Sequence, residues 1–290
     1  MNDKPNLLKT IQGNFNRMSK GQRIIAEYMI NNYDKAAFMT ASSLGKTLNI
    51  SESTVVRFAN TLGYSGYREL QKELQEVVKN KLTTVQRMSI AEGLGKGDHD
   101  YAKVMENDID NIKKTISEID RNAIKKSADL FLESNTIYVI GLRSSTFLAG
   151  YLCFYLRFLF SNVKLITAGP NDVFEQLVKV DKNDVVMGIT FPRYSKKTIE
   201  ALDYAKSKGC SIICLTDSLI SPAASKADIS LIAKSDMISF VDSLVAPMSL
   251  INAFIIALGE RKKVDINSYF EELEKIWQEY KVYDGNNIES

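Results

Sequence analysis

The stretch that decides the fold runs from Ala41 to Tyr64 and reads ASSLGKTLNISESTVVRFANTLGY. Apolar residues recur at helical spacing in its first part, at Ala41, Leu44 and Leu48. The next three residues break this stripe. The last of them, Ser51, is a favourable N-cap for a second helix because its hydroxyl can accept a hydrogen bond from a free backbone N–H. The stretch therefore predicts two short helices joined by a tight turn.

The second of these helices has two separate faces. One face is apolar and comprises Val55, Val56, Phe58, Ala59 and Leu62. The other is polar and comprises Ser53, Thr54, Arg57, Asn60 and Thr61. A purely structural helix could carry the polar face as solvated surface. A DNA-recognition helix, however, needs short hydroxyl and amide groups near its N-terminus and a long forked donor, and this helix supplies both. We therefore predict a helix-turn-helix that contacts DNA through Ser51, Ser53, Thr54, Arg57 and Asn60.

The charge distribution supports this prediction. Residues 1–82 contain 12 Lys and Arg against 7 Asp and Glu, whereas the whole chain contains 37 against 35. The positive charge is therefore concentrated at the end that resembles a DNA-binding domain, and a phosphate backbone attracts such a domain whatever its base sequence. Lys46 and Arg68 are the further candidates for DNA contacts, although either could equally be ordinary solubilising surface.

Length and composition predict two domains. A chain of 290 residues exceeds one ordinary domain. Residues 83–100 lose helical periodicity and cluster three glycines, which is typical of a linker. We expect a DNA-binding domain over 1–82 and a second domain over 101–290. The N-terminus lacks the charged and apolar run of a secretory signal, and the apolar stretch Leu244–Leu258 is interrupted by polar residues. We expect a buried helix there, no membrane segment and a cytoplasmic protein.

The cysteine and histidine content excludes several classes of function. The three cysteines, Cys153, Cys210 and Cys214, all lie in apolar surroundings and are expected to be reduced core thiols. The single histidine, His99, lies in the predicted linker. We therefore expect no metal site, no catalytic triad and no cofactor.

The remaining sequence predicts helices over 19–33, 65–82, 101–117 and 120–133, and then a change of pattern. Short apolar runs now alternate with helical segments, at 136–140, 163–166, 185–190, 211–216 and 229–232. Continuously apolar strands separated by helices predict a doubly wound parallel sheet covered on both faces. The second domain is therefore α/β and the first all-α. Such sheets bind ligands beyond the carboxyl ends of their strands.

Two of those strand ends carry the same kinds of polar residue. The first strand is followed by Gly141-Leu142-Arg143-Ser144-Ser145, and the third ends in Thr190 with Arg193 and Ser195 just beyond it. Backbone N–H groups at a helix start, hydroxyls and an arginine fork together suit a phosphate. The candidate anion ligands are Arg143, Ser144, Ser145, Thr190, Arg193 and Ser195. The hydroxyls could instead be only N-caps, but that alternative does not account for both arginines.

Taken together, these features resemble the RpiR/MurR family of bacterial transcription regulators. The resemblance rests on ISESTVVRFANTLGYSGYRELQ in the first domain and on GLRSS, ITFPRYSKKT, LTDSLISPAASKAD and FVDSLVAPMSLINAF in the second. It implies a helix-turn-helix domain joined to a sugar isomerase (SIS) domain. It also implies double-stranded operator DNA and a phosphorylated sugar as partners, and a homodimer or homotetramer.

The chain departs from the family pattern at the ligand loops. SIS domains commonly carry Ser-x-Ser-Gly-x-Thr after the third strand. Here Thr190 and Ser195 stand for the first Ser and the Thr, whereas Pro192 and Arg193 replace the second Ser and the Gly. Arg143 likewise replaces the second glycine of a Gly-x-Gly-x-Ser loop. Phosphate binding by the two arginines would be a coherent replacement.

These features leave three hypotheses for the function of the protein. The leading hypothesis is a transcription regulator, with a repressor favoured, that binds operator DNA and responds to a phosphosugar. The enzyme alternative is a phosphosugar isomerase, which needs a positioned general base. Glu175 and Glu200 lie near helices that follow strands, but each fits a solvated helix residue better. A third hypothesis, a purely structural dimer module, does not explain the polar recognition face.

Overall fold

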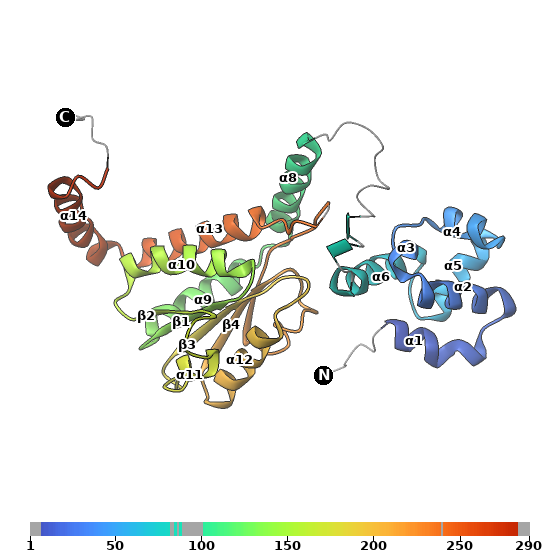
Figure 1. The fold of residues 1–290 in the computed structure, drawn as a ribbon, viewed down its shortest axis with the longest axis horizontal. Coiled ribbons are helices and arrows are strands. Elements are labelled where there is room, and N and C mark those ends of the chain that lie inside the picture. Colours follow the sequence, from blue (N-terminus) through green and yellow to red (C-terminus); the bar gives the residue numbers. More distant parts are fainter. Residues whose placement is uncertain (1–6, 82–83, 86, 89–100, 239, 284–290) are drawn as a thin grey trace. The chain divides into compact units, whose positions relative to one another are not determined.

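The computed structural model describes residues 7–81, 84–85, 87–88, 101–238 and 240–283 (Figure 1). Contacts between Cα atoms divide the chain into two compact units, Met1–Gly97 and Asp98–Ser290. Each unit is described by itself.

The N-terminal unit is all-helical. Its elements are α1 (Leu7–Asn14), η1 (Phe15–Arg17), α2 (Lys20–Asn31), α3 (Tyr33–Ala36), α4 (Ala41–Leu48), α5 (Glu52–Thr61) and α6 (Tyr67–Lys81). Ser19 begins α2 through a capping box: its side chain accepts from the Gln22 N–H, and the Gln22 side chain accepts from the Ser19 N–H. The sequence had predicted a helix over 19–33 with this cap, and both are confirmed.

The core of this unit forms where α2, α5 and α6 pack together. The side chains of Ile25, Met29, Phe58 and Leu70 are fully buried in one apolar cluster with Leu44. The hydroxyl of Tyr67, on α6, donates to the carbonyl oxygen of Met39 at 2.9 Å, and burial raises the pKa of Tyr67 to about 12. The face of α5 that was predicted to be apolar therefore holds the helix against its neighbours.

The second unit is an α/β domain. Its strands are β1 (Ile137–Gly141), β2 (Val163–Ile166), β3 (Val185–Ile189), β4 (Ser211–Thr216) and β5 (Ile229–Ile232). They form one parallel sheet in the order β2-β1-β3-β4-β5. Its helices are α8 (Tyr101–Glu118), α9 (Arg121–Glu133), α10 (Ser145–Leu159), α11 (Val173–Gln176), α12 (Lys196–Ser207), α13 (Val245–Arg261) and α14 (Lys263–Glu279). The predicted α/β fold class is confirmed.

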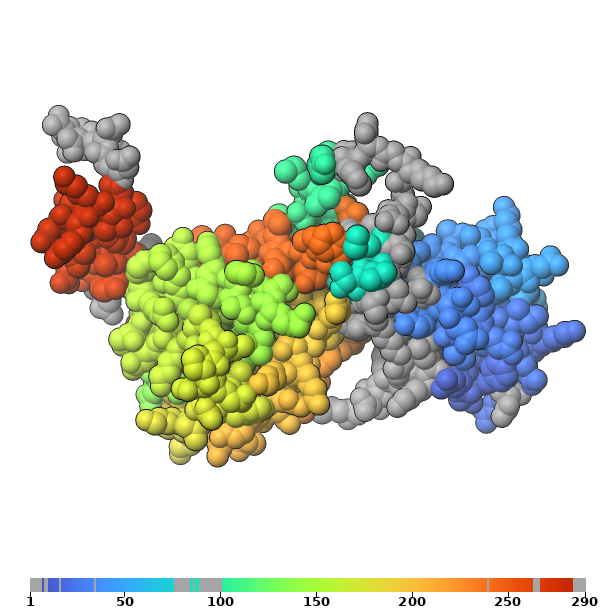
Figure 2. Space-filling view, in the orientation of Figure 1, coloured from blue at the N-terminus to red at the C-terminus, as the bar shows by residue number. Residues whose placement is uncertain are grey.

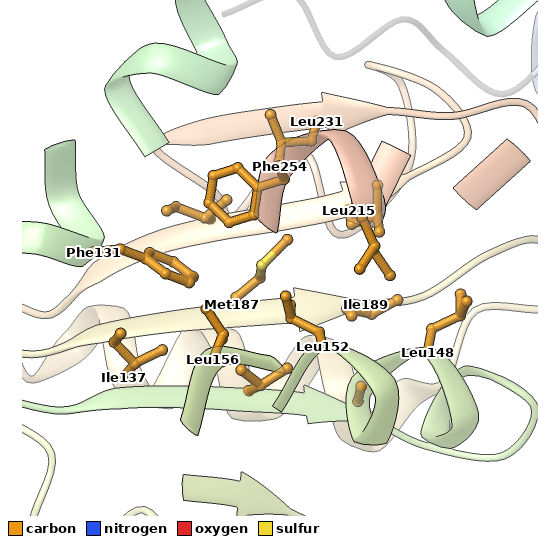
Figure 3. Packing of buried hydrophobic residues seen from close by; sticks show 14 of the residues in the cluster. Phe131, Ile137, Leu148, Leu152, Leu156, Met187, Ile189, Leu215, Leu231 and Phe254 are labelled. Atoms are coloured by element: carbon orange, nitrogen blue, oxygen red, sulfur yellow. The ribbon is translucent and has the colours of Figure 1, made fainter. Parts of the chain in front are cut away.

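Alternate residues of the strands enter two separate cores. On one face, Met187 and Ile189 pack with Leu152 of α10 and Phe254 of α13 (Figure 3). On the other face, Val186 packs with residues of α11 and α12. Helices therefore cover both faces of the sheet, as continuously apolar strands require.

Some elements were not predicted, and one prediction is only partly covered. Helices α1 and α14 were not foreseen. Within the segment expected to be a linker, Thr84, Val85, Arg87 and Met88 are helical, and the remaining residues lie outside the described part of the chain. The apolar stretch 244–258 forms most of α13, a helix with a buried face. None of the helices among the described residues is both long and apolar enough to cross a membrane.

The three cysteines are buried free thiols, as the sequence predicted. Burial raises the pKa of Cys153 and of Cys210 to about 12, and that of Cys214 to about 11. A thiol that stays protonated at neutral pH is a poor nucleophile, so these residues serve the core.

Candidate nucleic-acid interface and ligand site

The turn between α4 and α5 is compact. Asn49 ends α4 in the left-handed conformation, with φ of 54°, and the N–H of Ile50 donates to the carbonyl oxygen of Gly45 at 2.8 Å. A Cβ atom on Gly45 would lie 2.7 Å from the Ile50 oxygen, so only glycine allows this approach. Ser51 then begins α5 by accepting from the Thr54 N–H at 3.3 Å. The predicted N-cap is confirmed.

Four of the predicted DNA-binding residues form one hydrogen-bonded group at the start of α5. The Ser51 hydroxyl lies 3.0 Å from that of Ser53 and 2.8 Å from that of Thr54. The Arg57 guanidinium donates to the Thr54 hydroxyl at 3.4 Å and to the Ser53 carbonyl oxygen at 3.3 Å. Arg57 is therefore held along the polar face and its remaining donors are exposed. Asn60 is also exposed, one turn further on.

The other DNA-binding candidates lie outside α5. Lys46 on α4 and Arg68 on α6 are both exposed. Sequence reasoning missed Gln22, whose side-chain amide donates to the Thr61 hydroxyl at 2.8 Å and so fixes the start of α2 against the end of α5. The only signal in the sequence was a glutamine at the third position of a predicted helix. That position indicates a capping box, but it does not indicate the contact with Thr61.

The candidate ligand residues lie at the carboxyl ends of β1 and β3. These strands pair in parallel, with Gly141 opposite Ile189, so the loops that follow them leave the same edge of the sheet. Arg143 and Arg193 are exposed residues of these two loops, and both have positive φ, 59° and 69°. The left-handed conformation costs a non-glycine residue roughly 1–2 kcal/mol. The SIS loop patterns have glycine at the positions of Arg143 and Arg193, and the positive φ of both positions explains this preference.

The hydroxyls after β3 already cap the loop. The Thr190 hydroxyl accepts from the Ser195 N–H at 3.1 Å, and the Ser195 hydroxyl accepts from the Thr198 N–H at 3.3 Å. Each hydroxyl that accepts such a bond keeps its own O–H to donate. The capping alternative and phosphate binding are therefore compatible at the half-buried Ser195, whereas Thr190 is 2% exposed.

The two serines after β1 differ from each other. Ser145 is buried, with 5% of its surface exposed. Ser144 is exposed and makes no side-chain cap; its hydroxyl donates instead to a carboxylate oxygen of Asp242 at 3.0 Å. The sequence did not single out Asp242, although it lies in the quoted motif FVDSLVAPMSLINAF. Nothing in the spacing indicated that this loop returns to the first strand end.

A second cross-link joins the ends of β3 and β4. The Tyr194 hydroxyl donates to a carboxylate oxygen of Asp217 at 2.8 Å, and the Thr216 hydroxyl donates to the same oxygen at 3.3 Å. Asp217 is 5% exposed. Tyr194 was not a predicted site residue, because an aromatic side chain in a loop gives no signal of its partner.

No group of three or more His, Cys, Asp or Glu side chains that could hold a metal occurs in the part of the chain that the structure describes. The site consists instead of hydroxyls, backbone N–H groups at helix starts and two guanidinium groups. This is the chemistry that recognises a phosphate.

Comparison with known proteins identifies both units. The model of a helix-turn-helix domain of the rpiR family matches residues 5–81, and the SIS domain model matches residues 130–257. A curated relative, the HTH-type transcriptional regulator HexR of Pseudomonas aeruginosa, is 24% identical over 277 residues. The match covers 93% of this chain and 95% of that protein.

Two solved structures share the fold. The sugar isomerase domain of an RpiR transcription factor from Sphaerobacter thermophilus has a TM-score of 0.59 and 24% identity, covering 61% of this chain and 99% of that one. The Vibrio vulnificus NanR protein, complexed with ManNAc-6P, has a TM-score of 0.58 and 20% identity, covering 97% of this chain and 100% of that one.

Proposed function

Because this chain belongs to the RpiR family of helix-turn-helix transcription regulators that carry a SIS domain, we propose how its two sites work. Helix α5 contacts operator DNA, and the loops after β1 and β3 bind a phosphorylated sugar that changes the affinity for DNA. The proposal that these loops bind a phosphosugar rests on Arg143 and Arg193. Both have the left-handed backbone conformation and lie on loops that leave neighbouring strands.

On the DNA side, each candidate has a role set by its position. Ser51, Ser53, Thr54 and Asn60 are short groups on the exposed side of α5, suited to base edges in the major groove. Arg57 extends further and supplies a forked donor for a guanine edge. Lys46 and Arg68 contact phosphates and so add affinity without sequence preference.

In the ligand site, the arginines supply positive charge and the hydroxyl groups orient the bound phosphate. The guanidinium groups of Arg143 and Arg193 clamp the phosphate through paired charge-assisted hydrogen bonds. Ser144 and Ser195 donate their O–H groups to the same anion. Thr190, which is 2% exposed, contributes by holding the loop through its bond from the Ser195 N–H. Ser145, being buried, acts by holding the start of α10 and contributes its backbone N–H. The ManNAc-6P complex of NanR, a protein of the same fold, supports the assignment of a sugar phosphate.

We propose a homodimer as the working unit, in the cytoplasm. Helices α10 and α13 lie side by side (Figure 2). They carry the exposed apolar side chains Phe147, Phe154, Val245 and Ile256, which we propose form one patch. Such a patch is typical of an interface, and a stable one buries about 800 Å² per partner. A symmetric dimer presents two copies of α5, as helix-turn-helix recognition of two half-sites requires. Light scattering of the full chain at micromolar concentration tests this assembly.

A phosphosugar isomerase is the second candidate, and the structure gives it little support. The Glu175 carboxylate accepts from the Asp172 N–H at 3.1 Å in a capping box, and Glu200 pairs with Lys196 at 3.5 Å. The two glutamates that the sequence offered as a general base thus have structural partners. We therefore propose a regulator without isomerase activity, and favour a repressor. Incubating the purified protein with aldose and ketose phosphates tests the enzyme candidate.

The experiment that tests the proposal is a thermal-stability screen of the full chain against phosphosugars, each paired with its unphosphorylated sugar. A ligand that binds only the folded state raises the unfolding temperature by mass action. We expect stabilisation by at least one phosphosugar and none by the matching free sugar. A free sugar that stabilises equally well would contradict a phosphate-reading site.

A further inference from the structure

One hydrogen bond links the ligand loop to a segment outside it. The Ser144 hydroxyl, in the loop after β1, donates to Asp242 at 3.0 Å. Asp242 lies in the segment between β5 and α13, and its neighbour in sequence, Ser243, is 9% exposed. The Ser243 hydroxyl donates to the carboxylate of Asp108 on α8 and accepts from the Asn111 amide at 3.2 Å.

The same segment holds α8 at a second point. Asn111, which is fully buried, accepts from the N–H of Asp236 at 3.1 Å and donates to the carbonyl oxygen of Asp236 at 2.7 Å. The Asn107 amide donates to that oxygen at 2.6 Å, and the Lys114 ammonium lies 3.0 Å from the Asp236 carboxylate. We call the residues 236 and 243, with their partners on α8, the α8 clasp.

The clasp holds α8 through polar groups, and the helix leaves apolar ones exposed. Tyr101, Met105 and Ile116 are 77%, 69% and 65% exposed. Helix α8 also packs beside the start of α13 (Figure 1). The directed hydrogen bonds from Asn107, Asp108, Asn111 and Lys114 to residues 236 and 243 add a second attachment. Directed bonds respond to a displacement of an ångström, whereas a broad apolar contact tolerates it.

We propose that Asp242 is a positioning residue that couples phosphosugar binding to α8, an inference that rests on the function proposed above. A phosphate that accepts from the Ser144 hydroxyl competes with the Asp242 carboxylate for the same O–H. The two anions also repel each other. Asp242 therefore moves away when the phosphate binds, and Ser243, the next residue, loosens its bonds to α8.

Helix α8 begins at Tyr101, close in sequence to the division between the two units. Release of the clasp changes how firmly α8 is held, and we infer that this change affects DNA binding. Coupling of this kind is reciprocal, so DNA binding in turn alters the affinity for phosphate.

The first test needs no ligand. Hydrogen–deuterium exchange is followed over residues 101–118 in the full chain, with Ser144→Ala as the variant. Thr146→Ala is the matched control, because the Thr146 hydroxyl, at the start of α10, donates to the Gly141 carbonyl oxygen at the end of β1 at 2.9 Å. We expect exchange in α8 to accelerate about tenfold in Ser144→Ala, as loss of a charge-assisted hydrogen bond allows, and to stay at the wild-type rate in the control. Equal rates in all three proteins would overturn the inference.

The second test adds inorganic phosphate and the variant Asp242→Asn. In the wild type, phosphate should slow exchange in residues 141–147 and accelerate it in α8. Asp242→Asn should bind phosphate about fourfold more tightly, the effect of removing a unit charge about 5 Å away in a water-like dielectric. The response of its α8 to phosphate should be smaller than in the wild type, because the repulsion is removed while the Asn oxygen can still accept from Ser144. If Asp242 has only a structural role, Asp242→Asn should bind phosphate with the same affinity as the wild type or more weakly.

The outcomes separate the two claims. Slower exchange in 141–147 with no change in α8 overturns the coupling and leaves the proposed ligand site intact. If inorganic phosphate changes exchange in neither segment, both the coupling and the proposed ligand site are overturned.

Discussion

Arg143 and Arg193 follow neighbouring parallel strands and share a left-handed backbone, with φ of 59° and 69°. Glycine adopts this conformation without penalty, whereas arginine does not. A chain that keeps arginine at both positions thus accepts local strain at one edge of the sheet, which is a pattern found at functional sites.

This strain predicts an unusual response to glycine. Arg143→Gly should stabilise the second unit by about 1 kcal/mol, which raises its unfolding temperature by about 2–4 °C. Arg143→Ala keeps the unfavourable backbone and should gain nothing. Differential scanning calorimetry of the two variants without ligand measures the difference. An Arg143→Gly protein no more stable than Arg143→Ala would show that the position is not strained.

Arg57 is predicted to supply sequence-specific DNA affinity. DNA fragments selected from a random pool by the wild-type protein provide the operator probe. Arg57→Ala should bind them about 1–3 kcal/mol more weakly if the guanidinium contacts a guanine edge. Gel-shift titration measures this loss, and phosphosugar binding serves as the control, because Arg57 lies in the other unit. Undiminished affinity for the selected fragment would remove Arg57 from the recognition face.

Lys46 and Arg68 are predicted to act differently from Arg57. Replacing either with Ala should weaken binding to selected and unselected DNA alike, and should flatten the dependence of the logarithm of affinity on that of salt by about one unit of slope. Lys113→Ala is the control, since Lys113 is an exposed cation of the second unit. A loss confined to the selected sequence would contradict a phosphate contact.

Tyr67 is predicted to make the N-terminal unit sensitive to alkali. Burial raises its pKa from 10.0 to about 12. The unfolded state therefore loses this proton first as pH rises. The stability that the neutral phenol contributes is complete below pH 10 and is lost progressively towards pH 12, by at most about 1.4 kcal/mol per pH unit. Urea unfolding monitored by circular dichroism at several pH values measures the loss. In Tyr67→Phe the slope over this range should be shallower, and an unchanged slope would exclude Tyr67 as its source.

The sequence predicted the elements with strong periodicity and missed contacts between distant segments. The apolar runs predicted all five strands to within a residue, because a strand buried on both faces has no polar interruption. Ser51 and Ser19 were found because N-caps are local signals. The bonds from Ser144 to Asp242 and from Tyr194 to Asp217 join residues 98 and 23 positions apart. Only the topology of the sheet brings them together.

The sequence predicted where Arg143 and Arg193 lie but not their backbone conformation. Their positions at two strand ends could be read from the sequence, because glycine, serine and threonine after an apolar run mark a helix start. Their positive φ could not, since a left-handed arginine is rare and gives no pattern of its own. Helix α14 was missed because its apolar residues alternate with many charged ones, which gives a weak periodic signal.

The central claim is that the loops after β1 and β3 bind a phosphorylated sugar through Arg143 and Arg193. Calorimetric titration of the phosphosugar that stabilises the protein most, into the wild type and into Arg143→Ala and Arg193→Ala, tests it most directly. We predict that each variant weakens the phosphosugar more than its unphosphorylated sugar. Lysine at either position should restore binding only in part, because a point charge cannot reproduce a two-pronged donor. Wild-type affinity in both alanine variants, with dimer dissociation as their only defect, would contradict the arginine clamp.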